Sequence, residues 1–469
     1  MIANRRAAWN YSLDRSLELA ETYHKPLLVL EALRADHPWA CDRFHKFILD
    51  GMADNAKAFD KSPACYYPYM EKRPGDGKGL LQALSRTACA VVTDEYPAFF
   101  LPGMVAAAAK KIKVAMEKVD SNGILPLREP EQVFSSAYQF RRFLQKRLPP
   151  RLFEAPKARP FSGAKLPELA SVPPDILDRW PGVATDMLSH KKKGNTSSLP
   201  IEHSVPAVNY PGGSDRARNI LRRFIRNRMS SYIDTRNEPE RQGSSGLSPF
   251  MHFGHISAHQ ILHAVTEEER WIPGNMSDRG RGSKNGWWGM SATAEAFLDQ
   301  LITWRELGFN MCLLNSDYDR FESLPDWAQK TLRAHAKDSR PYRYALSDFE
   351  EASTHDPLWN AAQRQLRQEG RIHNYLRMLW GKKILHWSRS PLDALNIMIE
   401  LNNKYALDGR DPNSYSGIFW VLGRYDRPWG PERPVFGKIR YMTSENTARK
   451  YSVSRYIVKY SQNPGSTVS

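Results

Sequence analysis

The sequence predicts a two-part protein, in which an α/β region is followed by a region that is helical throughout. Three observations lead to this prediction. Short apolar runs alternate with helical segments over residues 1–148, which is typical of a parallel sheet with helical crossovers. Residues 149–212 hold 11 of the 32 prolines of the chain. From residue 213 to residue 469, apolar side chains recur with the spacing of α-helices.

The first region is expected to contain a parallel, Rossmann-like sheet. Strands are predicted at residues 26–33, 87–97 and 113–120, and helices at residues 12–23 and 100–112. The opening stretch MIANRRAAWN is turn-like, so no strand precedes the first helix. Either the start site is misassigned, or the sheet lacks its first strand.

Residues 149–212 are interpreted as an interdomain linker. Besides its prolines, this stretch contains the run Lys191–Lys193 and the small polar residues GNTSS, a composition typical of irregular chain. The predicted domains are therefore an α/β domain at residues 1–148 and a helical domain at residues 213–469.

Local signals divide the second region into elements. Residues 215–229 are predicted to form a helix with six arginines opposite an apolar face, which we interpret as a solvated basic surface. Asp356 is the expected N-cap of a helix that ends before residue 370, and a Ser-Pro start signal predicts another helix at residues 391–404. Residues 271–289 are Gly-rich and basic, and we expect a mobile loop there. The alternative is a loop that touches DNA through Arg279, Arg281 and Lys284.

The charge balance of the chain favours a polyanionic partner. The net charge of +16 and the pI of about 9.5 favour nucleic acid first and an anionic membrane surface second. The 13 tryptophans, 20 tyrosines and 19 phenylalanines supply flat faces on which bases can stack, although most aromatic residues in such a chain belong to the core.

The composition disfavours membrane insertion, export and metal binding. No apolar run approaches the roughly 18 residues of a membrane helix, and the N-terminus has no signal-peptide core. The four cysteines are scattered without a CxxC pair, which argues against a disulfide framework and a structural zinc site. We therefore expect no metal and a reducing, cytoplasmic location, with nucleoid association if the source is prokaryotic.

The segment LRMLWGKKILHW, residues 376–387, belongs to a helix with two distinct stripes. One stripe is apolar and indicates core packing; its members are Leu376, Trp380, Ile384 and Trp387. The neighbouring stripe is polar; its members are Asn374, Arg377, Met378 and Gly381. An arginine on such a stripe needs a carboxylate partner, for which Asp408 is the candidate. The glycine would let a ligand approach the backbone closely.

Three other stretches carry groups that are suited to a binding site. GSSGLSPFMHFGHIS, residues 243–257, offers N–H groups and hydroxyls at a helix start, which suits a pyrophosphate, although an ordinary serine cap has the same pattern. Residues 294–310 are predicted to form a helix that includes Trp304, Arg305 and Glu306. Residues 405–429 are expected to be a loop that is dense in polar and aromatic side chains.

Together these stretches resemble the photolyase/cryptochrome family, and within it the class II cyclobutane pyrimidine dimer (CPD) DNA photolyases. The resemblance is carried, in order over nearly the whole chain, by RRAAWNYSL, KPLLVLEALRADHPWACDRFHKFILDGMADN, LSPFMHFGHIS, WREL, HDPLWNAAQ, LRMLWGKKIL and KYALDGRDPNSYSGIFWVLGRYDRPW. It implies an N-terminal domain of the antenna type, whose chromophore the sequence does not identify, and a helical domain that binds FAD.

The resemblance also implies which residues hold FAD in a U shape. Tyr232 would lie near the pyrophosphate, which would be held by Ser244, Ser245, Gly246, Leu247 and Ser248. The isoalloxazine ring would be lined by Arg305, Asn374, Arg377 and Asp408. Asn402 would sit near flavin N5, where an amide can donate or accept a hydrogen bond as the ring changes redox state.

Electron transfer and DNA binding are implied in the same way. The tryptophans expected to pass an electron from the surface to photoexcited FAD are Trp359, Trp380 and Trp387. The expected partner is damaged DNA, and the chain is expected to be a monomer. The cavity for a flipped-out dimer would be walled by Trp304, Met378 and Trp420, and the distorted backbone would be gripped by Arg236, Asn237 and Arg427.

The implied enzyme is a deoxyribodipyrimidine photo-lyase. In its reaction, light excites reduced FADH⁻, one electron passes to the dimer, the cyclobutane ring splits, and the electron returns. Gln300 stands where the family pattern has a glutamate that bonds the dimer bases. Because an amide accepts a weaker hydrogen bond than a carboxylate, we expect slower repair.

Other functions fit the sequence less well. A cryptochrome-like flavoprotein without repair activity often has a long C-terminal extension, which the short tail after residue 449 does not resemble. A (6-4) photolyase needs a histidine pair above the flavin, and His252 and His255 lie outside the segments expected there. A plain nucleic-acid-binding protein leaves the polar stripe of residues 374–381 unexplained.

Overall fold

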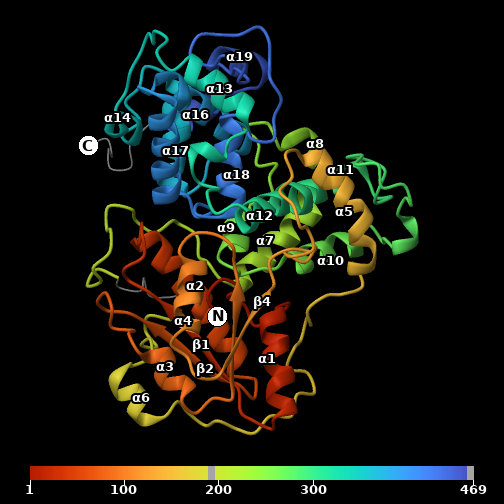
Figure 1. Cartoon of the computed structure of the whole chain (residues 1–469), viewed down its shortest axis with the longest axis vertical. Coiled ribbons are helices and arrows are strands. Elements are labelled where there is room, and N and C mark those ends of the chain that lie inside the picture. Colours follow the sequence, from red (N-terminus) through yellow and green to blue (C-terminus); the bar gives the residue numbers. More distant parts are fainter. Residues whose placement is uncertain (189–195, 462–469) are drawn as a thin grey trace. The chain divides into compact units, whose positions relative to one another are not determined.

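The computed structural model describes residues 1–188 and 196–461 (Figure 1). The Lys191–Lys193 run of the predicted linker lies outside the described residues. The chain forms two compact units, and each unit is built from several separate segments of the sequence. The first unit consists of residues 1–129, 147–223 and 246–270, and the second of residues 130–146, 224–245 and 271–469. The functional domain boundaries at residues 148 and 213 remain a prediction.

The strands of the first unit form two parallel pairs (Figure 1). Strand β1 (Leu28–Leu33) pairs with β2 (Cys65–Met70), and β3 (Ala90–Glu95) pairs with β4 (Ala115–Asp120). The predicted parallel arrangement is confirmed, but the single sheet is wrong, because the described strands form two separate sheets. Strand β2 was missed because its sequence CYYPYM contains a proline, which is uncommon inside strands.

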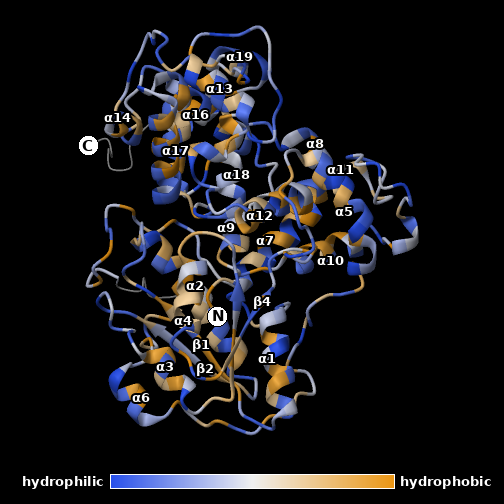
Figure 2. Cartoon of the chain, in the orientation of Figure 1, coloured by the Kyte–Doolittle hydropathy of each residue, from blue (hydrophilic) through white to orange (hydrophobic). Residues whose placement is uncertain are grey.

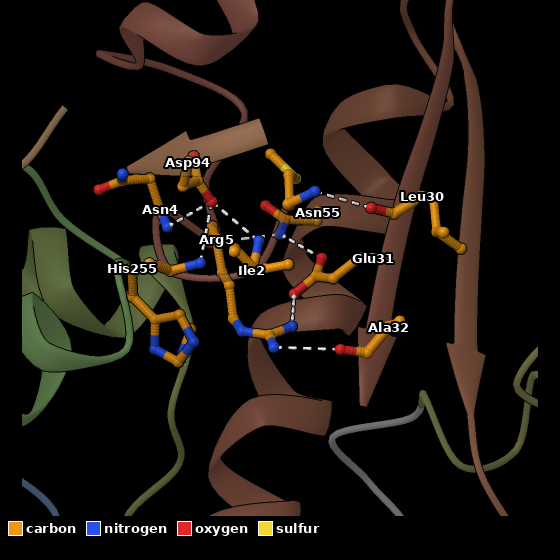
Figure 3. A network of polar contacts seen from close by, with 12 residues as sticks. Ile2, Asn4, Arg5, Leu30, Glu31, Ala32, Asn55, Asp94 and His255 are labelled. Atoms are coloured by element: carbon orange, nitrogen blue, oxygen red, sulfur yellow. Dashed lines mark hydrogen bonds and ion pairs between the residues drawn. The ribbon is translucent and has the colours of Figure 1, made fainter. Parts of the chain in front are cut away.

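The residues at the start of the chain bridge β1 and β3 without forming a strand (Figure 3). The amino group of Met1 donates to the Leu30 carbonyl of β1 at 2.8 Å. The backbone N–H groups of residues 2, 3 and 4 all converge on Oδ2 of Asp94 in β3, at 2.8, 2.8 and 3.0 Å. A side chain, rather than the ladder of a neighbouring strand, therefore satisfies these three donors.

Asp94 is the centre of a fully buried polar cluster. Besides the backbone donors, the Ser12 hydroxyl donates to Oδ1 at 2.8 Å. Burial alone would raise the pKa of Asp94, but the nearby ammonium group and the backbone donors lower it to about 2. Beside it, Arg5 pairs with Glu31 at 3.1 Å and Asn55 donates to the same carboxylate at 2.8 Å (Figure 3).

The helices of the first unit pack around these strands. They are α1 (Tyr11–Thr22), α2 (Asp42–Phe59), α3 (Leu80–Ser85), α4 (Leu101–Ala109), α6 (Pro174–Arg179), α9 (Ser248–His252) and α10 (Ala258–Glu268). The predicted linker takes part in the core, because Ile176 and Trp180 pack in one buried cluster with Tyr67 of β2. Linker residues with this burial stabilise the first unit rather than merely connecting segments.

Two helices cross the division between the units: α5 (Ala137–Arg151) and α7 (Ser214–Asn227). The short helices η1 (Met229–Ser231) and α8 (Tyr232–Thr235) follow α7. The remaining helices of the second unit are η2 (Pro273–Asn275), α11 (Ala292–Leu298), η3 (Asp299–Trp304), α12 (Arg305–Leu314), η4 (Phe321–Ser323), α13 (Asp326–Ala334), α14 (Leu346–Glu350), α15 (Pro357–Glu369), α16 (Asn374–Trp387), α17 (Pro391–Tyr405), α18 (Pro412–Val421), α19 (Ser444–Lys450) and α20 (Ser454–Lys459).

The predicted helix starts in the second unit are confirmed where the capping signals are local. Asp356 accepts hydrogen bonds from the N–H groups of Leu358 and Trp359, and α15 ends at Gly370 with φ of 67°. Ser390 caps α17 by accepting from the N–H of Asp393. Figure 2 shows that α16 and α17 carry both hydrophobic and hydrophilic residues along their length. In the described part of the chain, no helix combines the length and hydropathy needed to cross a membrane.

Two predictions for the second unit need correction. The stretch predicted as a loop at residues 405–429 contains α18, which begins at the capping pair Asp411 and Pro412. The Gly-rich segment 271–289 is anchored: Glu295, only 2 % exposed, accepts from the N–H groups of Gly289 and Met290 at 3.0 and 3.4 Å. A carboxylate that collects several backbone donors holds such a loop in place.

Candidate functional site

Helix α16 presents the two stripes that the sequence predicts. All members of the apolar stripe are at most 2 % exposed, which confirms the core prediction. On the polar stripe, an Arg377 Nη2 to Asp408 Oδ1 distance of 2.9 Å confirms the predicted ion pair. The two side chains are 21 % and 16 % exposed, so the pair is only partly buried. Asn374 is exposed and Met378 is half-buried.

Gly381 has a different role from the one predicted. A Cβ atom at this position would lie 2.6 Å from Cγ2 of Val421 and 3.1 Å from Sδ of Met398. The missing side chain therefore lets α18 and α17 pack closely against α16, rather than admitting a ligand. These neighbours are distant in sequence, so spacing along α16 alone did not reveal them.

Asn402 lies in a buried amide network on α17. Its Nδ2 lies 2.6 Å from Ser414 Oγ and 3.4 Å from Asn403 Oδ1. Asn403 Oδ1 also accepts from the backbone N–H of Arg410 at 2.9 Å, which identifies that atom as the oxygen. With Nδ2 directed into the network, Oδ1 is the atom of Asn402 that can accept a hydrogen bond from a ligand.

The three predicted relay tryptophans form one buried group. They are 0 %, 2 % and 1 % exposed in chain order. The Trp359 indole N–H donates to the Trp380 carbonyl at 3.0 Å, and its ring contacts Trp387 with centroids 6.0 Å apart and planes at 70°. The Trp380 indole N–H donates to Oε1 of Gln363 at 2.9 Å. Hydrogen bonds and edge-to-face packing thus fix the orientation of these rings.

The segment around Trp304 is not a regular α-helix. Residues 299–304 form the π-helical segment η3 between α11 and α12, where one continuous helix was predicted. Arg305 directly follows it, with its guanidinium 4.5 Å from the ring centre of Phe309. Gln300 and Trp304 lie on the π segment and are half-buried. Because π-helical turns are frequent at functional sites, this irregularity supports the region as part of the site.

The predicted pyrophosphate segment is divided between the units after residue 245. In the second unit, Arg228 donates to the carbonyl oxygens of Ser244 and Ser245 at 3.1 and 3.4 Å. The buried Tyr232 ring packs edge-on against Phe297. In the first unit, Gly246 has φ of 74°, Leu247 is buried, and Ser248 begins α9.

The residues predicted to contact DNA lie in the second unit. Arg427 is exposed, and its guanidinium is 4.4 Å from the ring centre of Trp429. The Arg236 guanidinium lies 5.6 Å from the ring centre of Tyr232, and Asn237 and Trp420 are half-buried. Their contacts with DNA remain a prediction.

Sequence reasoning missed several residues that shape this region. Ser414 and Asn403 form hydrogen bonds with Asn402. The only sequence feature that could have indicated Asn403 is its place directly after Asn402 in ELNNKY. Lys382 is 2 % exposed and donates to the Val421 carbonyl. Burial is the main cause that lowers the pKa of this lysine to about 7. It stands between the two stripes of α16, so helical spacing gave no reason to single it out.

Comparison with known proteins places these features in a wider context. The chain is 31 % identical over 458 residues to a deoxyribodipyrimidine photo-lyase of Methanothermobacter thermautotrophicus, covering 97 % of this chain and 92 % of that protein. It is 32 % identical to a deoxyribodipyrimidine photo-lyase of Potorous tridactylus, covering 98 % and 80 %. It is also 32 % identical to one of Arabidopsis thaliana, covering 97 % and 87 %.

A solved structure has a similar fold. The crystal structure of a bacterial class III photolyase from Agrobacterium tumefaciens matches with a TM-score of 0.70 and 18 % identity, over 97 % of this chain and 84 % of that chain. At this identity the match establishes the fold alone: small parallel sheets accompanied by a largely helical remainder. No family model matches the chain.

Proposed function

Because the chain belongs to the deoxyribodipyrimidine photo-lyase family, and is an enzyme of that type, we propose that it uses light and bound FAD to repair cyclobutane pyrimidine dimers in DNA. Within the family we assign it to class II. The observation that carries the proposal is the double character of α16. One face bears Arg377, paired with Asp408 but still partly exposed, and the other holds the buried indoles of Trp380 and Trp387.

The residues present fit the flavin part of FAD. A flavin ring offers carbonyl oxygens and ring nitrogens, and therefore needs oriented donors together with a few acceptors. Arg377 supplies donors whose direction Asp408 fixes. Asn402 supplies an acceptor, since its Nδ2 is engaged by Ser414 and Asn403. Arg305 and Asn374 are the further residues that we expect to line the ring.

The pyrophosphate would be held by the segment 244–248 together with Tyr232. Arg228 supports this role, because it fixes the backbone at Ser244 and Ser245 through their carbonyl oxygens. An arginine in this place also adds positive charge near a doubly charged phosphate group.

When bound and reduced, FAD supplies a light-driven one-electron donor. The chain positions the substrate for that chemistry. Trp304, Met378 and Trp420 would wall the dimer cavity, and their apolar faces favour a flipped-out pyrimidine dimer over water. Gln300 would hydrogen-bond the dimer bases through its amide. Asn402 Oδ1 would accept a hydrogen bond from a protonated flavin nitrogen and so favour the reduced form of the cofactor.

The tryptophans would return the cofactor to its reduced form. Trp359 touches both Trp380, through a hydrogen bond to its carbonyl, and Trp387, through ring contact. The hydrogen bond and the ring contact hold the three residues in one buried group, which supports a relay in which each indole passes on one electron.

Damaged DNA is the proposed partner, and we propose that the chain acts as a monomer. The net charge of +16 favours phosphate contacts, for which Arg236, Asn237 and Arg427 are the candidates. Binding should therefore weaken steeply with salt, because each neutralised phosphate releases counterions.

Repair of a defined substrate tests the proposal. Protein loaded with FAD and chemically reduced is mixed with ultraviolet-irradiated oligothymidylate, and thymine absorbance is followed under blue light and in the dark. We expect absorbance to recover only under blue light. Bound, reduced FAD without recovery would contradict the proposal and favour a cryptochrome-like flavoprotein.

A further inference from the structure

Trp387 is sealed from solvent, although the proposed relay must take electrons from outside the protein. Its side chain is 1 % exposed, and the indoles of Trp359 and Trp380 are equally buried. A dissolved reductant therefore cannot touch any of these three rings. An electron entering from solvent needs a further redox-active group that contacts both the relay and the surface.

Tyr344 meets this requirement on the side of Trp387. The two rings pack edge to face with centroids 5.7 Å apart and planes at 80°. The Tyr344 backbone N–H also donates to the Trp387 carbonyl at 3.2 Å, which holds the two residues together. The Tyr344 side chain is half-buried, so it reaches towards solvent where Trp387 does not.

The phenol of Tyr344 has a proton acceptor in place. Its oxygen lies 2.8 Å from Nδ1 of His355 and accepts from the backbone N–H of His355 at 3.0 Å. Since a backbone N–H can only donate, the phenol hydrogen remains for Nδ1. The His355 ring also contacts Trp387, with centroids 4.9 Å apart.

His355 is held as a neutral base. Burial is the largest effect and lowers the pKa of His355. The carboxylates of Asp356 and Glu445 raise this pKa and the ammonium of Lys383 lowers it, and the net pKa is below the ordinary value. Its free Nδ1 lone pair can therefore take a proton at neutral pH. Lys383 also places its ammonium 5.1 Å from the ring centre of Trp387, where it disfavours a second positive charge on that indole.

We propose that Tyr344 is the terminal electron donor of the relay and that His355 accepts its proton. This rests on the proposed function, in which one electron leaves the tryptophans under light and Trp387 is left as a radical cation. One electron then passes from the Tyr344 phenol to that indole, the O–H bond breaks, and the proton moves to His355 Nδ1. The products are neutral Trp387, a Tyr344 phenoxyl radical and a His355 imidazolium.

A small thiol restores the starting state. The phenoxyl oxygen takes a hydrogen atom from the thiol, leaving a thiyl radical, and the imidazolium releases its proton to solvent. The half-buried position of Tyr344 permits this contact. Tyr342 stacks on the other face of His355, with centroids 3.7 Å apart and 46 % of its side chain exposed, but its phenol is not needed for the step.

Transient absorption and electron paramagnetic resonance of FAD-loaded protein test the assignment. After a blue flash, the wild type should show a tryptophanyl signal that converts into a tyrosyl signal. Tyr344→Phe should abolish the tyrosyl signal and leave the tryptophanyl radical to recombine. His355→Gln keeps the phenol but removes the base, and should slow the conversion by roughly 100-fold, the scale of a positioned proton acceptor. Tyr342→Phe is the matched control and should convert like the wild type.

The outcomes separate this inference from the proposed function. A tryptophanyl signal that decays identically in the wild type and in Tyr344→Phe would overturn the role of Tyr344 alone. Equal loss of the tyrosyl signal in Tyr342→Phe would overturn the assignment as well. The absence of any tryptophanyl signal in FAD-loaded wild type would overturn the relay, and this inference with it. FAD content and far-ultraviolet circular dichroism of each variant verify that the protein is folded.

Discussion

Two polar regions of the molecule contain buried charges that are compensated very differently. In the first unit, the Asp94 carboxylate accepts three backbone N–H groups and the Ser12 hydroxyl. In the second unit, the ammonium of Lys382 on α16 is equally buried and donates to a neutral carbonyl, that of Val421. The pKa of Asp94 is lowered to about 2, and the pKa of Lys382 is lowered to about 7.

The same direction of shift has opposite meanings for the two groups. A lowered pKa means that the folded state favours the charged form of an acid but disfavours the charged form of a base. The Asp94 cluster therefore stabilises the fold, whereas Lys382 opposes it at neutral pH. The compensated Asp94 cluster has a structural role, whereas the buried ammonium of Lys382 costs stability at neutral pH.

The largest effect should come from breaking the proposed tryptophan relay at α16. Trp380→Phe should nearly abolish light-driven reduction of FAD, because the indole is removed, while dimer repair by chemically pre-reduced protein persists. Flavin absorbance under continuous blue light with thiol measures the loss. The control Trp288→Phe removes another buried tryptophan of the second unit and should reduce normally. Unimpaired reduction in Trp380→Phe would remove this residue from the relay.

Asp94→Asn should mainly affect folding. We expect the free energy of unfolding to fall by about 3–5 kcal/mol, since a buried charged partner is lost. The pKa of Asp94 lies below its unfolded value, so its contribution is full above about pH 4 and is lost as the pH falls towards 2. Urea titrations between pH 7 and pH 3 should show the difference between wild type and variant shrinking.

Asp36→Asn provides the comparison for that variant. Asp36 forms an exposed ion pair with Arg34, and such pairs contribute about 0–1 kcal/mol. An equal loss in both variants would contradict the special role of the Asp94 cluster.

Lys382→Met should stabilise the protein at neutral pH. The gain should reach a few kcal/mol, since each pKa unit corresponds to about 1.36 kcal/mol, reduced by about 1 kcal/mol for the lost hydrogen bond. Because the folded pKa of about 7 lies below the unfolded value of 10.5, wild-type stability should rise with pH between these values. The stability of the variant should lack this rise.

Lys330→Met on α13 removes an exposed ammonium and should change the unfolding free energy little. If Lys382→Met destabilised the protein at pH 7, the ammonium would be well compensated, and the contrast with Asp94 would fail.

Asp408→Asn should act on ligand binding more than on folding. Losing the charged partner of Arg377 removes about 1.5–3 kcal/mol of charge-assisted bonding, so FAD affinity should fall roughly 10- to 100-fold. Flavin fluorescence on titration of cofactor-free protein measures it. The control Asp393→Asn removes an exposed ion pair between Asp393 of α17 and Arg389. This variant should bind FAD with wild-type affinity. If Asp408→Asn bound FAD as tightly as the wild type, the flavin ring would not lie against the Arg377–Asp408 pair.

The smallest effect is expected on the π segment. Gln300→Glu should raise the repair yield by up to about tenfold, because a charge-assisted hydrogen bond is roughly twice as strong as a neutral one. Thymine recovery per absorbed photon measures it. An unchanged or lower yield would show that the amide, not a carboxylate, is the better partner at this position.

The sequence predicted those features that depend on residues close together in the chain or on a strict physical need. The starts of α15 and α17 follow from caps that bond N–H groups two or three residues on. The pairing of Arg377 with Asp408 follows because a partly buried arginine is stabilised by a carboxylate.

Features set by distant partners escaped prediction. The composition of residues 271–289 predicts mobility, but Gln145 bonds Gly282 and Ser283, and Glu295 accepts from the N–H of Gly289. The N–H groups of residues 2–4 are satisfied by Asp94, about 90 residues further along the chain, which local patterns could not reveal. Helix α18 was hidden because its Asp-Pro start signal lies among other polar residues.

The absence of a side chain at Gly381 sets how closely three helices of the candidate site can pack. Val421 and Met398 touch the backbone there, so α16, α17 and α18 share one contact point. Asn402 is carried by α17, its partner Ser414 by α18, and Trp380 by α16. A single added methyl group would push these three helices apart and shift Asn402, Ser414 and Trp380 together. A residue without chemistry of its own therefore sets the spacing on which all three depend.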